Sequence, residues 1–236
     1  MKILVTGATG MVGSELVRQA LQDTGIDQVT ALVRRPMDIV DSRLQVILHQ
    51  DFLHYEDLEA VFRTHEVCIW CLGTSQTQVS SEEYLKVTYT YTLAAAAAML
   101  KSNPEMRFIF LSAMGADPSE RSRTLFRRIK GRTERALQQL PFKELYLIRP
   151  GGIRAMSKKK NAAWYERVLS PVYFIFEWMT PRYVINSIEL ARVMIRIAKY
   201  GAPDQILNNP ALRRLGKEEV SRPPVRQAPT HTAAGR

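Results

Sequence analysis

The chain has 236 residues, 46% of them hydrophobic and 24% charged, which predicts one sizeable α/β domain with a well-filled core. Its longest mainly apolar stretch, Leu93 to Leu100, is too short to cross a bilayer, so we expect no transmembrane segment. The strand predicted directly after Met1 leaves no room for a cleaved targeting peptide, so we expect a cytoplasmic protein. The net charge of +10 admits nucleic acid, anionic lipid or a phosphorylated ligand as partner, and the four histidines show no metal-ligand spacing, so we expect no metal.

The first predicted strand, residues 2–6, runs into three glycines spaced three apart, Gly7, Gly10 and Gly13, and a helix predicted over 11–22 follows at once. Gly7 permits a sharp turn, Gly10 lets the backbone approach a pyrophosphate, and Gly13 lets the helix pack closely on the strand. The free N–H groups at the start of the helix would face the phosphates. We therefore favour a dinucleotide site over the alternative, an ordinary glycine-rich turn.

The second predicted strand, residues 28–33, ends in Arg34 and Arg35. At this distance from the glycines an NAD enzyme usually carries Asp or Glu, which binds the ribose 2′-hydroxyl. Arginine instead binds a 2′-phosphate through paired, charge-assisted hydrogen bonds. We predict that NADP(H) is favoured over NAD(H). The alternative is that both arginines are simply solvent-exposed residues at the end of a strand.

Further strand-like and helix-like segments alternate along the chain. The strands are predicted over 2–6, 28–33, 44–48, 66–71, 106–112 and 144–148, and the helices over 11–22, 55–63, 82–101, 122–139 and 187–199. Such alternation predicts a doubly wound parallel sheet of the Rossmann type, whose ligands bind at the carboxyl ends of the strands. The informative residues gather at those ends: Gly7 to Gly13, Arg34, Arg35, Asp51, Phe52, Leu72, Gly73, Thr74, Ser112, Pro150, Gly151 and Gly152.

Two local patterns have plain structural interpretations. Cys68 and Cys71 have the spacing of a redox pair, but they lie on a predicted buried strand and their side chains would point to opposite faces, so we interpret them as core cysteines. The alanine run from Ala94 to Ala98 predicts a helix packed closely on the sheet.

Basic residues crowd two segments, 121–135 and 213–226. Neither has interleaved aromatic residues or a nucleic-acid-binding signature, so we favour a solvated basic face over nucleic-acid binding. Residues 164–183 are rich in aromatic residues and follow Lys158 to Lys160. We expect a substrate-side wall or lid within 154–185, with membrane-surface contact as the alternative. Residues 1–215 would form the NAD(P)-binding domain, and 217–236 predict a disordered tail.

Four strings carry a family resemblance: TGATGMVG at 6–13, CLGT at 71–74, LSAMGAD at 111–117 and RPGG at 149–152. With these the chain resembles the short-chain dehydrogenase/reductase superfamily in its extended or atypical form. It is most similar to the Tat-interacting-protein-like branch, whose members are small NADP-binding proteins related to sugar-nucleotide epimerases.

The resemblance implies a cofactor role for matching positions. The pyrophosphate would bind to the backbone of Thr9, Gly10, Met11 and Val12. Asp51 and Phe52 would flank the adenine, and Leu72, Gly73 and the following Thr74 would lie along the adenosine and pyrophosphate. Lys130 would hold the nicotinamide ribose, and Pro150, Gly151, Gly152 and Ile153 would offer backbone to the nicotinamide amide.

One departure from the family pattern bears on catalysis. The family has Tyr-x-x-x-Lys, in which the tyrosine transfers the substrate proton and the lysine lowers its pKa. Here Phe126 stands at the tyrosine position before Lys130, and Ser112 lies at or one residue before the position of the usual catalytic serine. Lys130 and Ser112 are the candidate catalytic residues. Lys130 as a cofactor ligand alone, and Phe126 as a core residue in a stripe with Ile129, Thr133 and Leu137, are the alternatives.

Two functions remain open from the sequence. The first is an NADP-dependent oxidoreductase or epimerase-like enzyme acting on an unidentified small molecule, with water or another group relaying the proton. The second is a non-catalytic NADPH-sensing or interaction protein with a protein partner. A membrane-surface or nucleic-acid binder ranks behind both.

Overall fold

The computed structural model describes residues 1–156 and 183–218. Seven parallel strands form one sheet in the order β3-β2-β1-β4-β5-β6-β9. This confirms the predicted doubly wound Rossmann-type fold, and each of the six predicted strands lies within one residue of its observed bounds. The strands are β1 Lys2–Thr6, β2 Gln28–Val33, β3 Leu44–Leu48, β4 Val67–Trp70, β5 Arg107–Leu111, β6 Glu144–Arg149 and β9 Ile206–Asn208.

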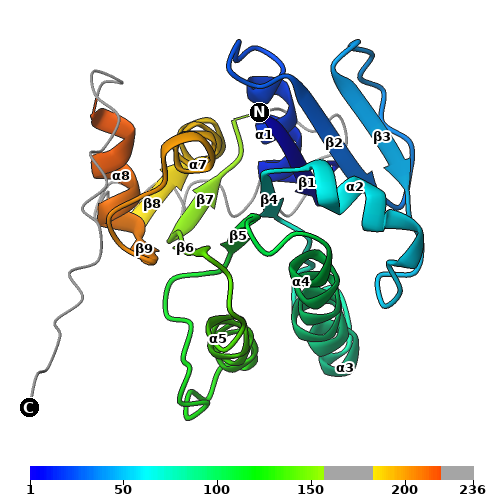
Figure 1. Cartoon of the computed structure of the whole chain (residues 1–236). Coiled ribbons are helices and arrows are strands. Elements are labelled where there is room, and N and C mark those ends of the chain that lie inside the picture. The colour runs from blue at the N-terminus through cyan, green and yellow to red at the C-terminus, as the bar shows by residue number, and fades with distance from the viewer. Residues whose placement is uncertain (157–182, 219–236) are drawn as a thin grey trace, which may run out of the picture.

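Helices cover both faces of the sheet (Figure 1). On one face lie α1 Met11–Ala20, α7 Ser187–Tyr200 and α8 Asn209–Lys217. On the other lie α2 Glu59–Thr64, α3 Ser81–Leu85, α4 Tyr91–Ser102 and α5 Leu125–Gln138. The long helix predicted over 82–101 is divided, because a π-helical turn, Lys86–Thr90, separates α3 from α4.

The core has two halves because successive strand side chains point to opposite faces. Cys68 belongs to the half that packs under α2 and α4, whereas Cys71 packs against the half under α1 and α7. Both thiols are free, and burial raises the pKa of Cys71 to about 12. Cys68 is a core cysteine as predicted, whereas Cys71 packs against the core but is only partly buried. Ala95 and Ala96 are fully buried, so the alanine run packs closely as predicted.

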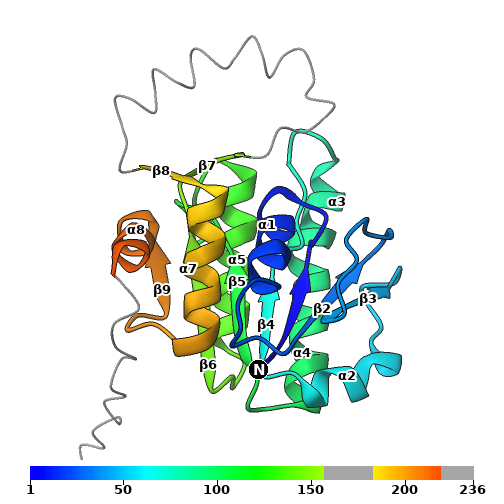
Figure 2. The ribbon, with the colours of Figure 1, turned by 90° about the horizontal axis from the view of Figure 1, so that it is seen from above.

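The carboxyl-terminal third holds elements that the periodicity did not predict. These are β7 Gly152–Arg154, β8 Val184–Asn186, β9 and α8, and each of the three strands has only three residues. The parallel pair β7–β8 lies beyond the carboxyl ends of the main strands (Figure 2). Helix α8 ends at Lys217, the residue at which the tail is predicted to begin. Residues 219–236 and the aromatic segment 164–182 lie outside the described residues.

Candidate functional site

A groove opens where β1 separates β2 from β4, which is the topological switch point of the sheet. Gly7 has φ +62°, and a Cβ there would lie 2.4 Å from the carbonyl oxygen of Cys71. A Cβ on Gly13 would lie 2.2 Å from the carbonyl oxygen of Gly7. Side chains at these two positions would push β4 or α1 away from the loop, so both glycines are needed for this geometry.

The amino-terminal end of α1 faces this groove without a capping side chain. Gly10 is its N-cap residue, no side chain caps the helix, and the first turn carries no carboxylate. The opposite wall is fixed by Thr6, whose hydroxyl oxygen accepts hydrogen bonds from the backbone N–H groups of Cys71 and Leu72, both at 3.1 Å. A helix amino terminus of this kind presents N–H groups and a positive dipole end to an anion.

The predicted cofactor residues are largely brought together here. Arg34 and Arg35 are exposed at the end of β2, and neither forms an ion pair with another described residue. The groove therefore combines a helix amino terminus with two available guanidinium groups. Of the predicted residues, Gly7, Thr9, Gly10, Arg34, Arg35, Phe52, Leu72 and Gly73 line it. Met11, Val12, Asp51 and Thr74 lie outside its lining.

Phe52 and Asp51 differ in their position although they are neighbours. Phe52 is buried and forms part of the wall, with its ring edge-on to Trp70. Asp51 is exposed, and its carboxylate lies 2.8 Å from Nδ1 of His54 and accepts the backbone N–H of Leu53 at 3.0 Å. The hydrogen bond to His54 lowers the pKa of Asp51. Asp51 thus caps its own turn.

Lys130 lies on α5 at the other end of the site. Its Nζ donates to the carbonyl oxygen of Leu111 at 2.8 Å and sits 4.6 Å from the centroid of the Phe110 ring. Burial lowers the pKa of Lys130 to about 8, while Cys71 and Glu134 draw it upward. Cys71 lines the groove, whereas Lys130 itself is not among the lining residues.

Ser112 takes part in a buried network that the sequence did not predict. Its hydroxyl donates to Oε1 of Glu134, a fully buried carboxylate that also forms an ion pair with Arg149. Nε of Arg149 lies 2.9 Å from Oε1 and 3.2 Å from Oε2. The network joins the ends of β5 and β6 to α5, one helical turn beyond Lys130. With its proton directed to Glu134, Ser112 can only accept a hydrogen bond from a substrate in this arrangement.

Phe126 lies one turn before Lys130 but is only half-buried, unlike Ile129, Thr133 and Leu137. Its backbone N–H donates to Gln76 at 3.1 Å, and the guanidinium of Arg127 lies 5.8 Å from its ring. Phe126 belongs to neither half of the core, so the core-stripe interpretation was wrong for this residue.

The loop after β6 is held by one backbone hydrogen bond and one side-chain hydrogen bond. The carbonyl oxygen of Pro150 accepts from the N–H of Met114 at 2.8 Å, and Gly151 donates to Oδ1 of Asn209 at 3.1 Å. Gly152 and Ile153 enter β7. Asn209, like Glu134, was missed by the sequence reasoning. Its only local signal is the Asn-Asn-Pro string that starts α8.

Several arginines before and along α5 have partners within the chain. Arg135 pairs with Glu120, Arg128 donates to backbone carbonyls, and Arg132 lies 4.7 Å from the ring centroid of Tyr89. Among residues 1–156 and 183–218, no helix is long and apolar enough to cross a membrane. Within the same ranges no cluster of three metal-ligating side chains occurs.

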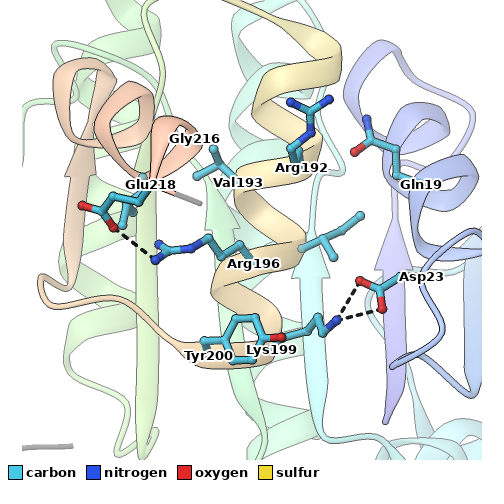
Figure 3. Close-up of a pocket in the computed structure, with 11 residues that line it drawn as sticks. Gln19, Asp23, Arg192, Val193, Arg196, Lys199, Tyr200, Gly216 and Glu218 are labelled. Atoms are coloured by element: carbon cyan, nitrogen blue, oxygen red, sulfur yellow. Dashed lines mark hydrogen bonds and ion pairs between the residues drawn. The ribbon is translucent and has the colours of Figure 1, made fainter. Parts of the chain in front are cut away.

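A second hollow lies between α1, α7 and α8, away from the glycine loop (Figure 3). Lys199 pairs with Asp23 at 2.8 Å and Arg196 with Glu218 at 3.1 Å across it. Its floor includes Val193. These ion pairs tie α7 to the turn after α1 and to the end of α8.

Comparison with known proteins agrees with the geometry. Residues 7–167 match the model of a family described as NAD(P)H-binding. The chain is 24% identical over 221 residues to Protein HTATIP2 of Rattus norvegicus, covering 92% of this chain and 89% of that protein. It is 29% identical over 167 residues to Protein FMP52, mitochondrial, of Candida albicans, covering 68% and 71%.

Solved structures share the fold at low sequence identity. Gre2 of Candida albicans in complex with NADPH superposes with a TM-score of 0.66 at 13% identity, over 88% of this chain and 77% of that one. The UDP-glucuronic acid 4-epimerase of Bacillus cereus in complex with NAD has a TM-score of 0.64 at 15% identity, over 88% and 78%. The neighbours therefore include complexes with either dinucleotide.

Proposed function

The chain belongs to the NAD(P)H-binding family, in the Tat-interacting-protein-like branch of the short-chain dehydrogenases/reductases, and from this premise we propose that it binds NADP(H) in preference to NAD(H). The observation that carries the proposal is the shared groove of Gly7, Gly10, Arg34 and Arg35. The α1 amino terminus would take the pyrophosphate, and the two arginines would take the 2′-phosphate. When bound, the cofactor would supply hydride chemistry or act as a sensed ligand. The cytoplasmic location stays a prediction.

Isothermal titration of the full chain with NADPH and NADH tests this proposal. One charge-assisted contact contributes about 1.5–3 kcal/mol, so we expect NADPH to bind at least ~10-fold more tightly. Equal affinities, or tighter binding of NADH, would show that the arginines do not recognise a 2′-phosphate.

Between an enzyme and a binding protein, we favour a non-catalytic NADPH-sensing role. Phe126 has no proton to transfer, and the hydroxyl proton of Ser112 is directed to Glu134. Losing a general acid typically costs 10²–10⁴-fold in rate.

One observation supports a second candidate, a reductase. The Lys130 ammonium group donates to the carbonyl oxygen of Leu111 at 2.8 Å and interacts electrostatically with Cys71, which lines the groove. Because burial lowers the pKa of Lys130 to about 8, this group could donate a proton at neutral pH. NADPH oxidation at 340 nm against a panel of aldehydes and quinones separates the two functions, with Phe126→Tyr as the restoring variant. A sensor oxidises no NADPH, either as the unmodified protein or as Phe126→Tyr. A reductase gives turnover in the unmodified protein that Lys130→Met abolishes.

A further inference from the structure

Asn209 is a fully buried polar residue at the start of α8, and the function proposed above gives it no role. Its Oδ1 accepts the backbone N–H of Gly151 at 3.1 Å. Its Nδ2 lies 3.5 Å from the carbonyl oxygen of Val184, a long contact. One side chain thus connects the loop after β6 with β8 and with the carboxyl-terminal helix.

The same loop is constrained from two other sides. The N–H of Met114, in the loop after β5, donates to the carbonyl oxygen of Pro150 at 2.8 Å. A Cβ on Gly151 would lie only 1.8 Å from the carbonyl oxygen of Tyr183. The peptide between Pro150 and Gly151 therefore has both its polar groups engaged and little free space, which fixes its orientation.

The sheet order indicates which half of a dinucleotide meets this loop. Arg34 and Arg35 lie at the end of β2, on one side of the glycine loop, so the adenosine half would lie over β2 and β3. The nicotinamide half must then extend the other way, over β4, β5 and β6. The ammonium group of Lys130, which donates to the last residue of β5, and the Pro150–Gly151 peptide after β6 lie on that side.

We propose that Asn209 is a positioning residue for the nicotinamide half of NADPH, which rests on the proposed function. By holding the N–H of Gly151, Asn209 sets the direction of the following peptide groups, which would receive the nicotinamide amide. A loop ordered before binding loses less conformational freedom when the ligand arrives. Asn209 contacts Gly151 and Val184, away from the end of β2 where the adenosine half would lie, so its effect would be confined to ligands that carry the nicotinamide.

The neighbouring residue provides a matched control. Asn208 is exposed, and its Oδ1 caps α8 by accepting the N–H of Ala211 at 3.1 Å. Asn208→Ala removes a helix cap from the same helix but leaves the Gly151 contact in place. Asn209→Asp keeps an acceptor oxygen toward Gly151, and Asn209→Leu keeps the buried volume without polar atoms.

The test is titration calorimetry of the full chain with NADPH and with 2′,5′-ADP, which lacks the nicotinamide half. Asn209→Ala should weaken NADPH binding about 5- to 10-fold while 2′,5′-ADP binding changes less than about 2-fold. Asn209→Asp and Asn208→Ala should keep the wild-type ratio. If Asn209→Ala does not fold, Asn209→Leu replaces it in the same titration and the same selective loss is expected.

Two results would overturn the inference: a parallel loss of both ligands on removing the side chain, or no loss of either. The fluorescence of bound NADPH gives a second readout, because a nicotinamide ring released from its loop should emit as in free solution. Failure of the wild-type chain to bind either nucleotide would instead overturn the proposed function, and the role of Asn209 with it.

Discussion

Replacing Glu134 by glutamine should destabilise the protein strongly. Glu134 is fully buried and binds two partners, the Ser112 hydroxyl and the Arg149 guanidinium. The Arg149 side chain is 21% exposed. Breaking a buried ion pair costs about 3–5 kcal/mol, because the remaining charge is left uncompensated. Glutamine retains one acceptor oxygen, and the partly exposed Arg149 side chain remains in contact with water. We therefore expect the free energy of unfolding to fall by about 2–4 kcal/mol. At roughly 2–4 °C per kcal/mol for a chain of this size, the melting temperature falls by roughly 5–15 °C.

The assay is urea unfolding followed by circular dichroism at pH 7, with Glu120→Gln as control. Glu120 pairs with Arg135 near the surface, where the two side chains are 32% and 51% exposed, so the same change there should cost less than about 1 kcal/mol. Equal effects of the two substitutions would refute the claim that the Glu134 network holds β5, β6 and α5 together.

Three further predictions concern the same unfolding measurement. Gly131→Ala places a Cβ 2.0 Å from the carbonyl carbon of Asp117 and should lower the free energy of unfolding by about 1–3 kcal/mol, whereas the new Cβ of Gly73→Ala meets nothing within 4 Å and should change it by less than about 0.5 kcal/mol. Similar changes in the two variants would contradict the close packing of the Asp117 loop on α5. Tyr55→Phe should stabilise by about 1 kcal/mol, because the Tyr55 hydroxyl is buried with no hydrogen-bond partner among the described residues, and a clear loss of stability would reveal a partner. Burial lowers the pKa of His65, so the unfolded chain takes up a proton first and the free energy of unfolding should fall as pH drops below about 6.5. His65→Gln should flatten this slope below about pH 6.5, and an unchanged slope would assign it to other groups.

The glycine loop and the parallel sheet could be predicted because their signals are local in sequence. Gly7, Gly10 and Gly13 lie within seven residues, directly between an apolar strand and an amphipathic helix. Strands β1, β2, β4, β5 and β6 are mainly apolar and largely buried, as expected for strands covered on both faces, whereas the edge strand β3 is partly exposed. The arginines at the end of β2 reach the same groove because parallel strands end at one edge of the sheet.

The missed features depend on contacts between distant parts of the chain. Gly151 and Asn209 are 58 positions apart, and Ser112 and Glu134 are 22 apart. Glu134 occurs in a strongly basic segment, where a lone carboxylate is expected on the surface, and only its position one turn beyond Lys130 hinted at burial. Three-residue strands such as β9 show too little periodicity to be recognised.

The central claim is that Arg34 and Arg35 select the 2′-phosphate, and the direct measurement is the ratio of NADPH to NADH affinity in wild type and in the double variant Arg34→Ala/Arg35→Ala. We expect a wild-type ratio of at least ~10 to fall to between about 1 and 2, with NADH affinity changed less than about 2-fold. Arg63→Ala, which removes an exposed arginine outside the groove, should leave the ratio unchanged. An equal loss of both ligands in the double variant, or a ratio that stays at its wild-type value, would contradict the account.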